Sequence, residues 1–217
     1  FTKKMFKMLF TPIMVGKMEL KNRIVMPAMH YLSSWDGMLL PHHTDYFAER
    51  AKGGTALIII GGCTIDEYSG APNMISVRDD KFIPALSDLA KAVQAHGSKI
   101  AAQLYHAGRF VHSMLLGGKQ SISSSPVRSK LTGETPRQLS IPEIKQIQKN
   151  YALAAARVKR AGFDAVEIIA GAGYLISQFL SPVVNRRKDE YGGEYENRMR
   201  FGLEVAHEVR QEVGPDF

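Results

Sequence analysis

The amino-acid sequence predicts an α/β protein in which the strands of a parallel sheet alternate with amphipathic helices. Three helix ends are each followed by a glycine and then by an apolar run, at Gly53, Gly97 and Gly162, and a glycine just past a helix supplies the left-handed residue that ends it. The segment 57–60, Leu-Ile-Ile-Ile, is apolar on successive residues, as expected for a strand covered on both faces. Such alternation builds either a (β/α)8 barrel or an open doubly wound sheet, and these patterns are compatible with both.

Four strands are expected, and in chain order they cover residues 23–26, 56–60, 99–104 and 163–169. Helices are expected between them. A short apolar stripe ends before Gly97 and consists of Leu86, Leu89 and Val93. Ser140 and Glu143 form a capping box that predicts the start of a longer helix. The apolar positions of that helix recur at helical spacing and are Ile144, Ile147, Tyr151, Ala154 and Val158. A third stripe consists of Met199, Gly202, Ala206, Val209 and Val213.

Residues 214–217 follow the third stripe at the point where the pattern predicts a fifth strand. A (β/α)8 barrel takes roughly 250 residues, so this chain of 217 residues is expected to hold about the first four βα units of such a barrel. Residues 1–217 would then be one N-terminal half-barrel, with no second domain present. A complete, small open sheet is the competing interpretation.

The composition is that of an ordinary globular protein. Hydrophobic residues make up 45% and charged residues 23%, which disfavours disordered and fibrous classes, and no apolar run reaches the ~20 residues of a membrane-spanning helix. The net charge of +7 would suit an anionic ligand, although a generally basic surface explains it more readily. Because Cys63 is the only cysteine, no internal disulfide can form, and a cytoplasmic location is expected.

Binding sites in parallel α/β folds lie at the carboxyl ends of the strands, so the residues that follow the four strands are the candidates. Small residues predominate in three of these segments and would let a flat ligand approach the backbone, although such glycines more often form simple turns. No Gly-x-Gly-x-x-Gly or Walker pattern follows a strand. The seven histidines lack the spacing of zinc ligands, so no metal site is expected. The sequence has no basic stripe with interleaved aromatic residues, so nucleic-acid binding is not expected.

Several longer motifs together resemble the old yellow enzyme family of FMN-dependent NADH:flavin oxidoreductases, and more closely its branch of 2,4-dienoyl-CoA reductases and enoate reductases. They span nearly the whole chain: LFTP at 9–12, LKNRIVM at 20–26, QLYHAGR at 103–109, GYLISQFLSP at 173–182, NRR at 185–187, DEYGG at 189–193 and ENR at 196–198. The resemblance implies a (β/α)8 TIM barrel with FMN at its carboxyl-terminal mouth, of which residues 1–217 would be the N-terminal half.

The same resemblance implies roles for individual residues. Pro27, Ala28 and Met29 would lie against the flavin ring, and Gly62 would contact its polar edge. Gln103 would hydrogen-bond the pyrimidine side of the ring, and a primary amide offers both a donor and an acceptor for this purpose. Without the resemblance, Gln103 could equally be an amide that satisfies the ends of neighbouring strands.

The chain also departs from the pattern of many family members, which carry two histidines, or a histidine and an asparagine, after the fourth strand. Those positions are Ile169 and Ala172 here. The departure favours the dienoyl-CoA reductase branch, in which the following tyrosine, here Tyr174, is linked to proton donation and substrate binding. His30 stands where other members have a cysteine or threonine near flavin N5, again as in that branch, and the resemblance implies that it would contact the substrate.

The implied reaction is hydride transfer from NADH or NADPH to FMN and then to an activated C=C of an enoyl or dienoyl thioester or a related enoate. Iron-sulfur and FAD sites would exist only if C-terminal regions are missing from this chain. The expected partners are a small-molecule substrate and a second copy in a homo-oligomer or a complementary half-barrel. The alternative is a truncated, non-catalytic half-barrel that acts as a structural or self-associating module. An unrelated barrel lyase would need a Schiff-base lysine at a strand end, and the sequence has none there.

Overall fold

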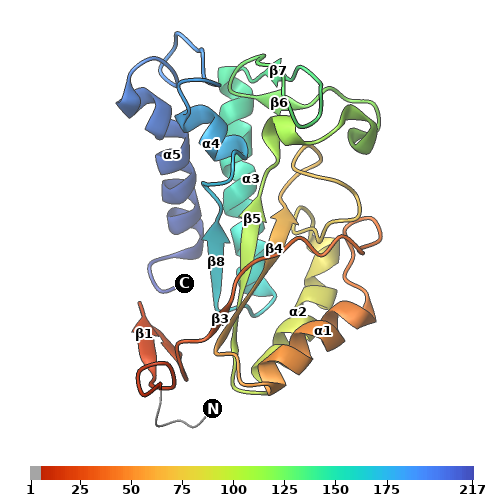
Figure 1. Ribbon diagram of the computed structural model, residues 1–217, viewed down its shortest axis with the longest axis vertical. Coiled ribbons are helices and arrows are strands. Elements are labelled where there is room, and N and C mark those ends of the chain that lie inside the picture. The colour runs from red at the N-terminus through yellow and green to blue at the C-terminus, as the bar shows by residue number, and fades with distance from the viewer. Residues whose placement is uncertain (1–5) are drawn as a thin grey trace.

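A computed structural model describes residues 6–217 of the chain. Its central sheet has four parallel strands, which lie side by side in chain order (Figure 1): β3 (Val25–Met26), β4 (Leu57–Thr64), β5 (Lys99–Tyr105) and β8 (Ala165–Ile168). A doubly wound sheet reverses its strand order at a switch point, so the sequential order excludes that alternative. The fold is the first half of a (β/α)8 barrel, as the sequence predicts.

Helices cover one face of this sheet (Figure 1). The long ones are α1 (Pro41–Lys52), α2 (Ile83–Gln94), which the 3-10 turn η1 (Asp80–Phe82) precedes, α3 (Ile141–Arg160) and α5 (Tyr195–Val213). The capping box at the start of α3 forms as predicted, because Ser140 donates its backbone N–H to the Glu143 carboxylate at 2.8 Å. Gly97 and Gly162 adopt φ values of 67° and 84°, which confirms two of the predicted helix ends. At the first, Gly53 is right-handed with φ −66° and the next residue, Gly54, has the positive φ of 102°. Within residues 6–217, no helix combines the length and apolar character needed to cross a bilayer.

Alternate side chains of the strands enter two different clusters, because successive residues of a strand point to opposite faces. The face toward the helices is fully buried and carries Ile58, Ile60, Ile100, Ala102 and Leu104. On the other face, Leu57 and Ala101 pack against Leu20. Leu20 belongs to an antiparallel hairpin, β1 (Ile13–Val15) and β2 (Met18–Leu20), which lies near the amino ends of the strands (Figure 1). The hairpin therefore forms the floor of the half-barrel.

The buried face of α5 differs from the predicted stripe. The structure buries Phe201, Val205, Val209 and Val213, so only the last two predicted positions face the core, and Met199, Gly202 and Ala206 line a surface cleft instead. The reason is a stacked pair of rings: Phe201 lies on Phe179 of the short helix α4 (Leu175–Leu180), with 4.3 Å between centroids.

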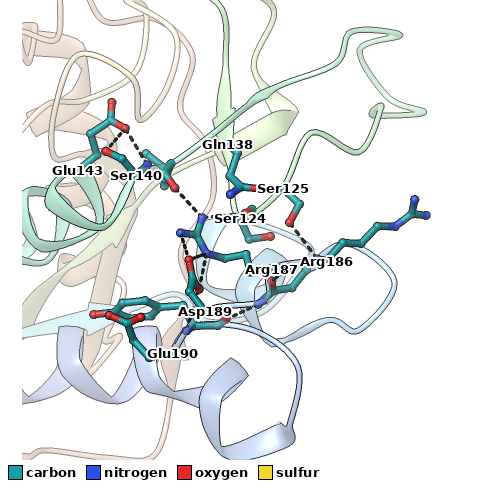
Figure 2. A network of polar contacts seen from close by, with 12 residues as sticks. Ser124, Ser125, Gln138, Ser140, Glu143, Arg186, Arg187, Asp189 and Glu190 are labelled. Carbon is teal, nitrogen blue, oxygen red and sulfur yellow. Dashed lines mark hydrogen bonds and ion pairs between the residues drawn. The ribbon is translucent and has the colours of Figure 1, made fainter.

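A buried arginine ties together two loops at the carboxyl-terminal end of the sheet. The long connection between β5 and α3 contains η2 (Gly108–Phe110), η3 (Ser113–Leu116) and the paired short strands β6 (Ile122–Ser123) and β7 (Arg137–Gln138). Arg187, with 1% of its side chain exposed, pairs with Asp189 at 2.7 Å. It also donates to the carbonyls of Ser124 and Leu139, at 3.1 and 2.6 Å (Figure 2). The NRR and DEYGG motifs of the sequence therefore join this long connection to the loop after α4.

Candidate active site

The candidate site lies at the carboxyl ends of the strands, on the face of the sheet away from the helices. Three segments meet there: residues 27–30 follow β3, Gly61 and Gly62 lie in β4, and Gln103 lies in β5. His30 forms a β-bridge with Gly61. The structure thus brings together the residues predicted to hold a flavin, which are Pro27, Ala28, Met29, Gly62 and Gln103.

The two glycines let the backbone of β4 lie directly against side chains of its neighbours. A Cβ at Gly61 would lie 2.7 Å from the Cβ of Gln103 and 3.1 Å from the Cβ of Ala28. At Gly62, a Cβ would lie 2.6 Å from the Cβ of Tyr105. Any side chain at either position would displace a strand, so Gly62 sets the position of Tyr105 as well as offering its backbone at the mouth.

Gln103 is held by a carboxylate on the adjacent strand. Its Nε2 donates a hydrogen bond of 2.6 Å to Oε1 of Glu167, and the two residues are register partners on β5 and β8. Gln103 is 6% exposed, and its carbonyl oxygen accepts no hydrogen bond from any described residue. Glu167 was not predicted as a site residue, although a carboxylate inside the apolar run 163–169 was a usable signal.

Three aromatic rings form the upper part of the site. The ring centroid of Tyr105 lies 4.8 Å from that of His30 and 4.5 Å from that of Tyr174, both edge-on. Burial raises the pKa of the Tyr105 phenol, and the neighbouring Tyr174 raises it further. Partial burial lowers the pKa of the His30 imidazole below its usual value. At neutral pH the Tyr105 phenol therefore holds its proton and the His30 imidazole is neutral. Tyr105 was also missed, although it follows Gln103 by two residues and so shares its strand face.

Tyr174 stands at the start of α4 on a backbone fixed from two sides. The next residue, Leu175, donates its N–H to the carbonyl of His106 at 3.0 Å. The Gln178 amide donates to the carbonyl of Gly173 at 2.8 Å. Ile169, one of the positions where a histidine is absent, packs beside Tyr105 and Tyr174 in an apolar cluster.

The geometry of these residues fits an isoalloxazine ring. Pro27 and Met29 are exposed at the end of β3, with Met29 51% exposed, and would offer apolar surface to a ring face. The free carbonyl of Gln103 is an acceptor for the polar edge of such a ring. Among residues 6–217, no three His, Cys, Asp or Glu side chains lie close enough to hold a metal ion.

Comparisons with known proteins agree with this arrangement. The model of the NADH:flavin oxidoreductase / NADH oxidase family matches residues 8–217. A "Metal reductase" of Desulforamulus reducens is 51% identical over 209 residues, which are 96% of this chain and 31% of that protein. The structure of morphinone reductase in complex with tetrahydroNAD has a TM-score of 0.91 at 34% identity, over 96% of this chain and 61% of that one. A 2-naphthoyl-CoA reductase in complex with 2-naphthoyl-CoA has a TM-score of 0.92 at 30% identity, over 98% of this chain and 34% of that one.

The chain thus spans between 31% and 61% of the length of these relatives. The family match leaves out only the first seven residues and includes every strand of the sheet and every residue of the candidate site. It also confirms the resemblance on which the flavin-site prediction rests. This chain belongs to the NADH:flavin oxidoreductase / NADH oxidase family.

Proposed function

We propose that this chain forms the FMN-binding half of a barrel that transfers hydride from NADH or NADPH to an activated C=C. The observation that carries the proposal is the convergence of Gln103, Gly62 and residues 27–29 with Tyr174 at one edge of the sheet. In such a reaction, the residues that hold the flavin ring must lie close to the residues that orient the substrate.

When bound, FMN supplies the hydride-carrying chemistry. The residues of this chain position the flavin and the substrate and supply the proton. Gln103, braced by Glu167 at 2.6 Å, offers its carbonyl to the pyrimidine edge. Pro27, Ala28 and Met29 cover one ring face, and His30 lies where the substrate would approach. Tyr174 carries a phenol O–H and would deliver its proton to the carbon that does not receive hydride.

We propose that the substrate is an enoyl or dienoyl thioester or a related enoate. The absence of histidine at Ile169 and Ala172 leaves Tyr174 as the only proton-bearing side chain between residues 169 and 175, which supports a tyrosine-based proton transfer. The solved relative named 2-naphthoyl-CoA reductase was crystallised with an acyl-CoA. Both observations favour a thioester over a simple enone.

The alternative function is a non-catalytic half-barrel that pairs with a second copy or with a separate complementary half. The edge strands β3 and β8 each have only one neighbour in the sheet of residues 6–217, and unpaired edges invite pairing. This alternative does not require the free acceptor on Gln103 or the aromatic cluster around Tyr174, and for that reason we favour the reductase.

An absorption spectrum of the full protein that carries this chain tests the proposal. A flavin band near ~450 nm is expected. It should bleach on anaerobic addition of NADH or NADPH and return on addition of 2,4-hexadienoyl-CoA. A protein that acquires no flavin band after incubation with FMN would support the structural module instead.

A further inference from the structure

A cleft beside Tyr174 holds an arginine without a counter-ion. The cleft has a volume of about 540 Å³ and is lined by Arg109, Gly173, Ser177, Gln178 and the segment 180–184. It contains no carboxylate. Gly173 directly precedes Tyr174, and the ring of Phe110, the residue after Arg109, lies 6.3 Å from the ring of Tyr174, so the cleft lies near the proposed proton donor.

Arg109 is fixed in place by bonds that leave much of its guanidinium unused. Its backbone N–H donates to Oε1 of Gln178 at 3.1 Å, and Nη1 donates to the carbonyl of Val127 at 3.2 Å. The Nε atom is buried without an acceptor among the described residues, and Arg109 forms no ion pair within residues 6–217. Burial lowers the pKa of the guanidinium, although arginine keeps its charge at neutral pH. A partly desolvated cation of this kind is stabilised by an anion.

The segment that Arg109 contacts is basic, and Nη1 also donates to the carbonyl of Arg128 at 3.4 Å. Arg128 and Lys130 are exposed in the segment that follows Val127. The backbone N–H of Arg186 donates to Oγ of Ser125 at 2.9 Å, and the Arg186 side chain extends away from the polar network (Figure 2). Cations on neighbouring segments raise the local concentration of anionic ligands.

We propose that the Arg109 cleft binds the anionic part of the substrate, a phosphate of an acyl-CoA, while the C=C lies beside Tyr174. The planar donors of a guanidinium match phosphate oxygens. The apolar wall formed by Leu180, Pro182 and Val183 suits the methyl and methylene groups of the pantetheine arm, which links the phosphates to the thioester through two amides. This inference rests on the proposed function, because it assigns the substrate class of that same site.

The test uses the FMN-loaded full protein with two thioesters that share one electrophile, crotonyl-CoA and the neutral S-ethyl crotonothioate. Arg109→Gln should raise KM for crotonyl-CoA by roughly 10- to 100-fold, the value of a charge-assisted hydrogen bond. KM for the neutral thioester and for NADH should change by less than about twofold. Arg109→Lys, which keeps the charge, should recover part of the loss. Arg160→Gln, at the exposed pair with Asp80, is the matched control and should leave every KM unchanged.

An equal rise in KM for both thioesters would overturn the proposal. Arg109 would then only stabilise the loop at Val127. A loss confined to NADH would also overturn it, because the cleft would then hold the pyrophosphate of the nicotinamide donor. Calorimetric titration of the oxidised protein with coenzyme A separates this inference from the proposed function, since it needs no C=C reduction. Binding that Arg109→Gln weakens supports the cleft even if no thioester is reduced, and binding of equal strength in both proteins refutes it.

Discussion

The side-chain amide of Gln178 occupies the space in which a side chain at Gly108 would lie. A Cβ at Gly108 would be 2.1 Å from Oε1 of Gln178. The same amide accepts a hydrogen bond from the backbone of Arg109 and donates to the carbonyls of Ala107 and Gly173, at 3.0 and 2.8 Å. One buried glutamine thus joins the loop after β5 to the loop that presents Tyr174, and it can do so only because residue 108 has no side chain.

Gly108→Ala should therefore destabilise the protein far more than a glycine substitution in open space. Gly108 and Gly117 have similar left-handed φ values, 60° and 65°, but nothing lies within 4 Å of a Cβ at Gly117. Gly117→Ala should cost about 1 kcal/mol for the left-handed backbone, and Gly108→Ala roughly 2 to 4 kcal/mol because overpacking is added. Urea unfolding measures both, and equal free energies of unfolding for the two variants would contradict the role given to Gln178.

Removal of the partner of the buried arginine should be costly as well. Asp189→Asn leaves the Arg187 charge, 1% exposed, without its carboxylate. We expect a loss of roughly 3 kcal/mol, the low end for an uncompensated buried charge, because two carbonyls still accept from Arg187. The control is Asp88→Asn, since Asp88 pairs with Lys91 on an exposed surface, and it should cost less than about 0.5 kcal/mol. Comparable losses in the two variants would show that the Arg187 pair contributes no more than a surface pair.

The sequence predicted what depends on local pattern and missed what depends on contacts between distant segments. The capping box at Ser140 and the helix end at Gly162 involve only neighbouring residues, so both were predictable. The first three of the five predicted core positions of α5 were wrong, because the stacking of Phe201 on Phe179 joins residues that periodicity does not connect.

The same distinction applies to the site. The rule that ligands bind at the carboxyl ends of parallel strands selected the segments that contain Gly62 and Gln103, and the family resemblance implied roles for these two residues. Tyr105 could have been found from its place two residues after Gln103, whereas Glu167 required more, because a cross-strand partner is known only when the register is known. The bond between Gln103 and Glu167 exists because these two residues are paired between β5 and β8.

The ion pair at the start of α3 should give stability that depends on pH. Hydrogen bonds from Arg137, then from Ser140, lower the pKa of the Glu143 carboxyl from 4.5 to about 2 despite some burial. Because the folded-state pKa is depressed, the stabilisation is present above the unfolded pKa of ~4.3 and is lost as the pH falls toward about 2. Glu143 is 39% exposed, so solvent screens the effect, and Glu143→Gln should lower Tm by only about 1 to 3 °C at pH 7. Thermal melts should show this gap closing below about pH 4; a gap that stays constant from pH 7 to pH 3 would contradict the assignment.

Glu167→Gln should weaken FMN binding without unfolding the protein. The variant replaces a charge-assisted bond to Gln103 with a weaker neutral one, and the Gln103 amide is then free to turn its carbonyl away from the mouth. We expect the dissociation constant for FMN, measured by flavin fluorescence on the full protein, to rise roughly tenfold. Glu212→Gln, at an exposed position near the end of α5, is the control. An unchanged FMN affinity in Glu167→Gln would mean that Gln103 does not contact the flavin or does not need its brace.

Tyr174→Phe tests the proton transfer directly. The phenol lies edge-on to Tyr105, with centroids 4.5 Å apart, so the substitution removes one oxygen while the ring packing stays in place. Loss of a general acid should slow reduction of 2,4-hexadienoyl-CoA by roughly 10² or more, whereas bleaching of the flavin by NADH, which needs no proton from this residue, should keep its rate. Tyr195→Phe, on an exposed tyrosine of α5, controls for the loss of any phenol and should leave both half-reactions unchanged. The two half-reactions can be followed separately by anaerobic stopped-flow absorbance on the full protein. If Tyr174→Phe leaves both at wild-type rates, Tyr174 only packs against Tyr105, and the proton must come from another side chain or from water.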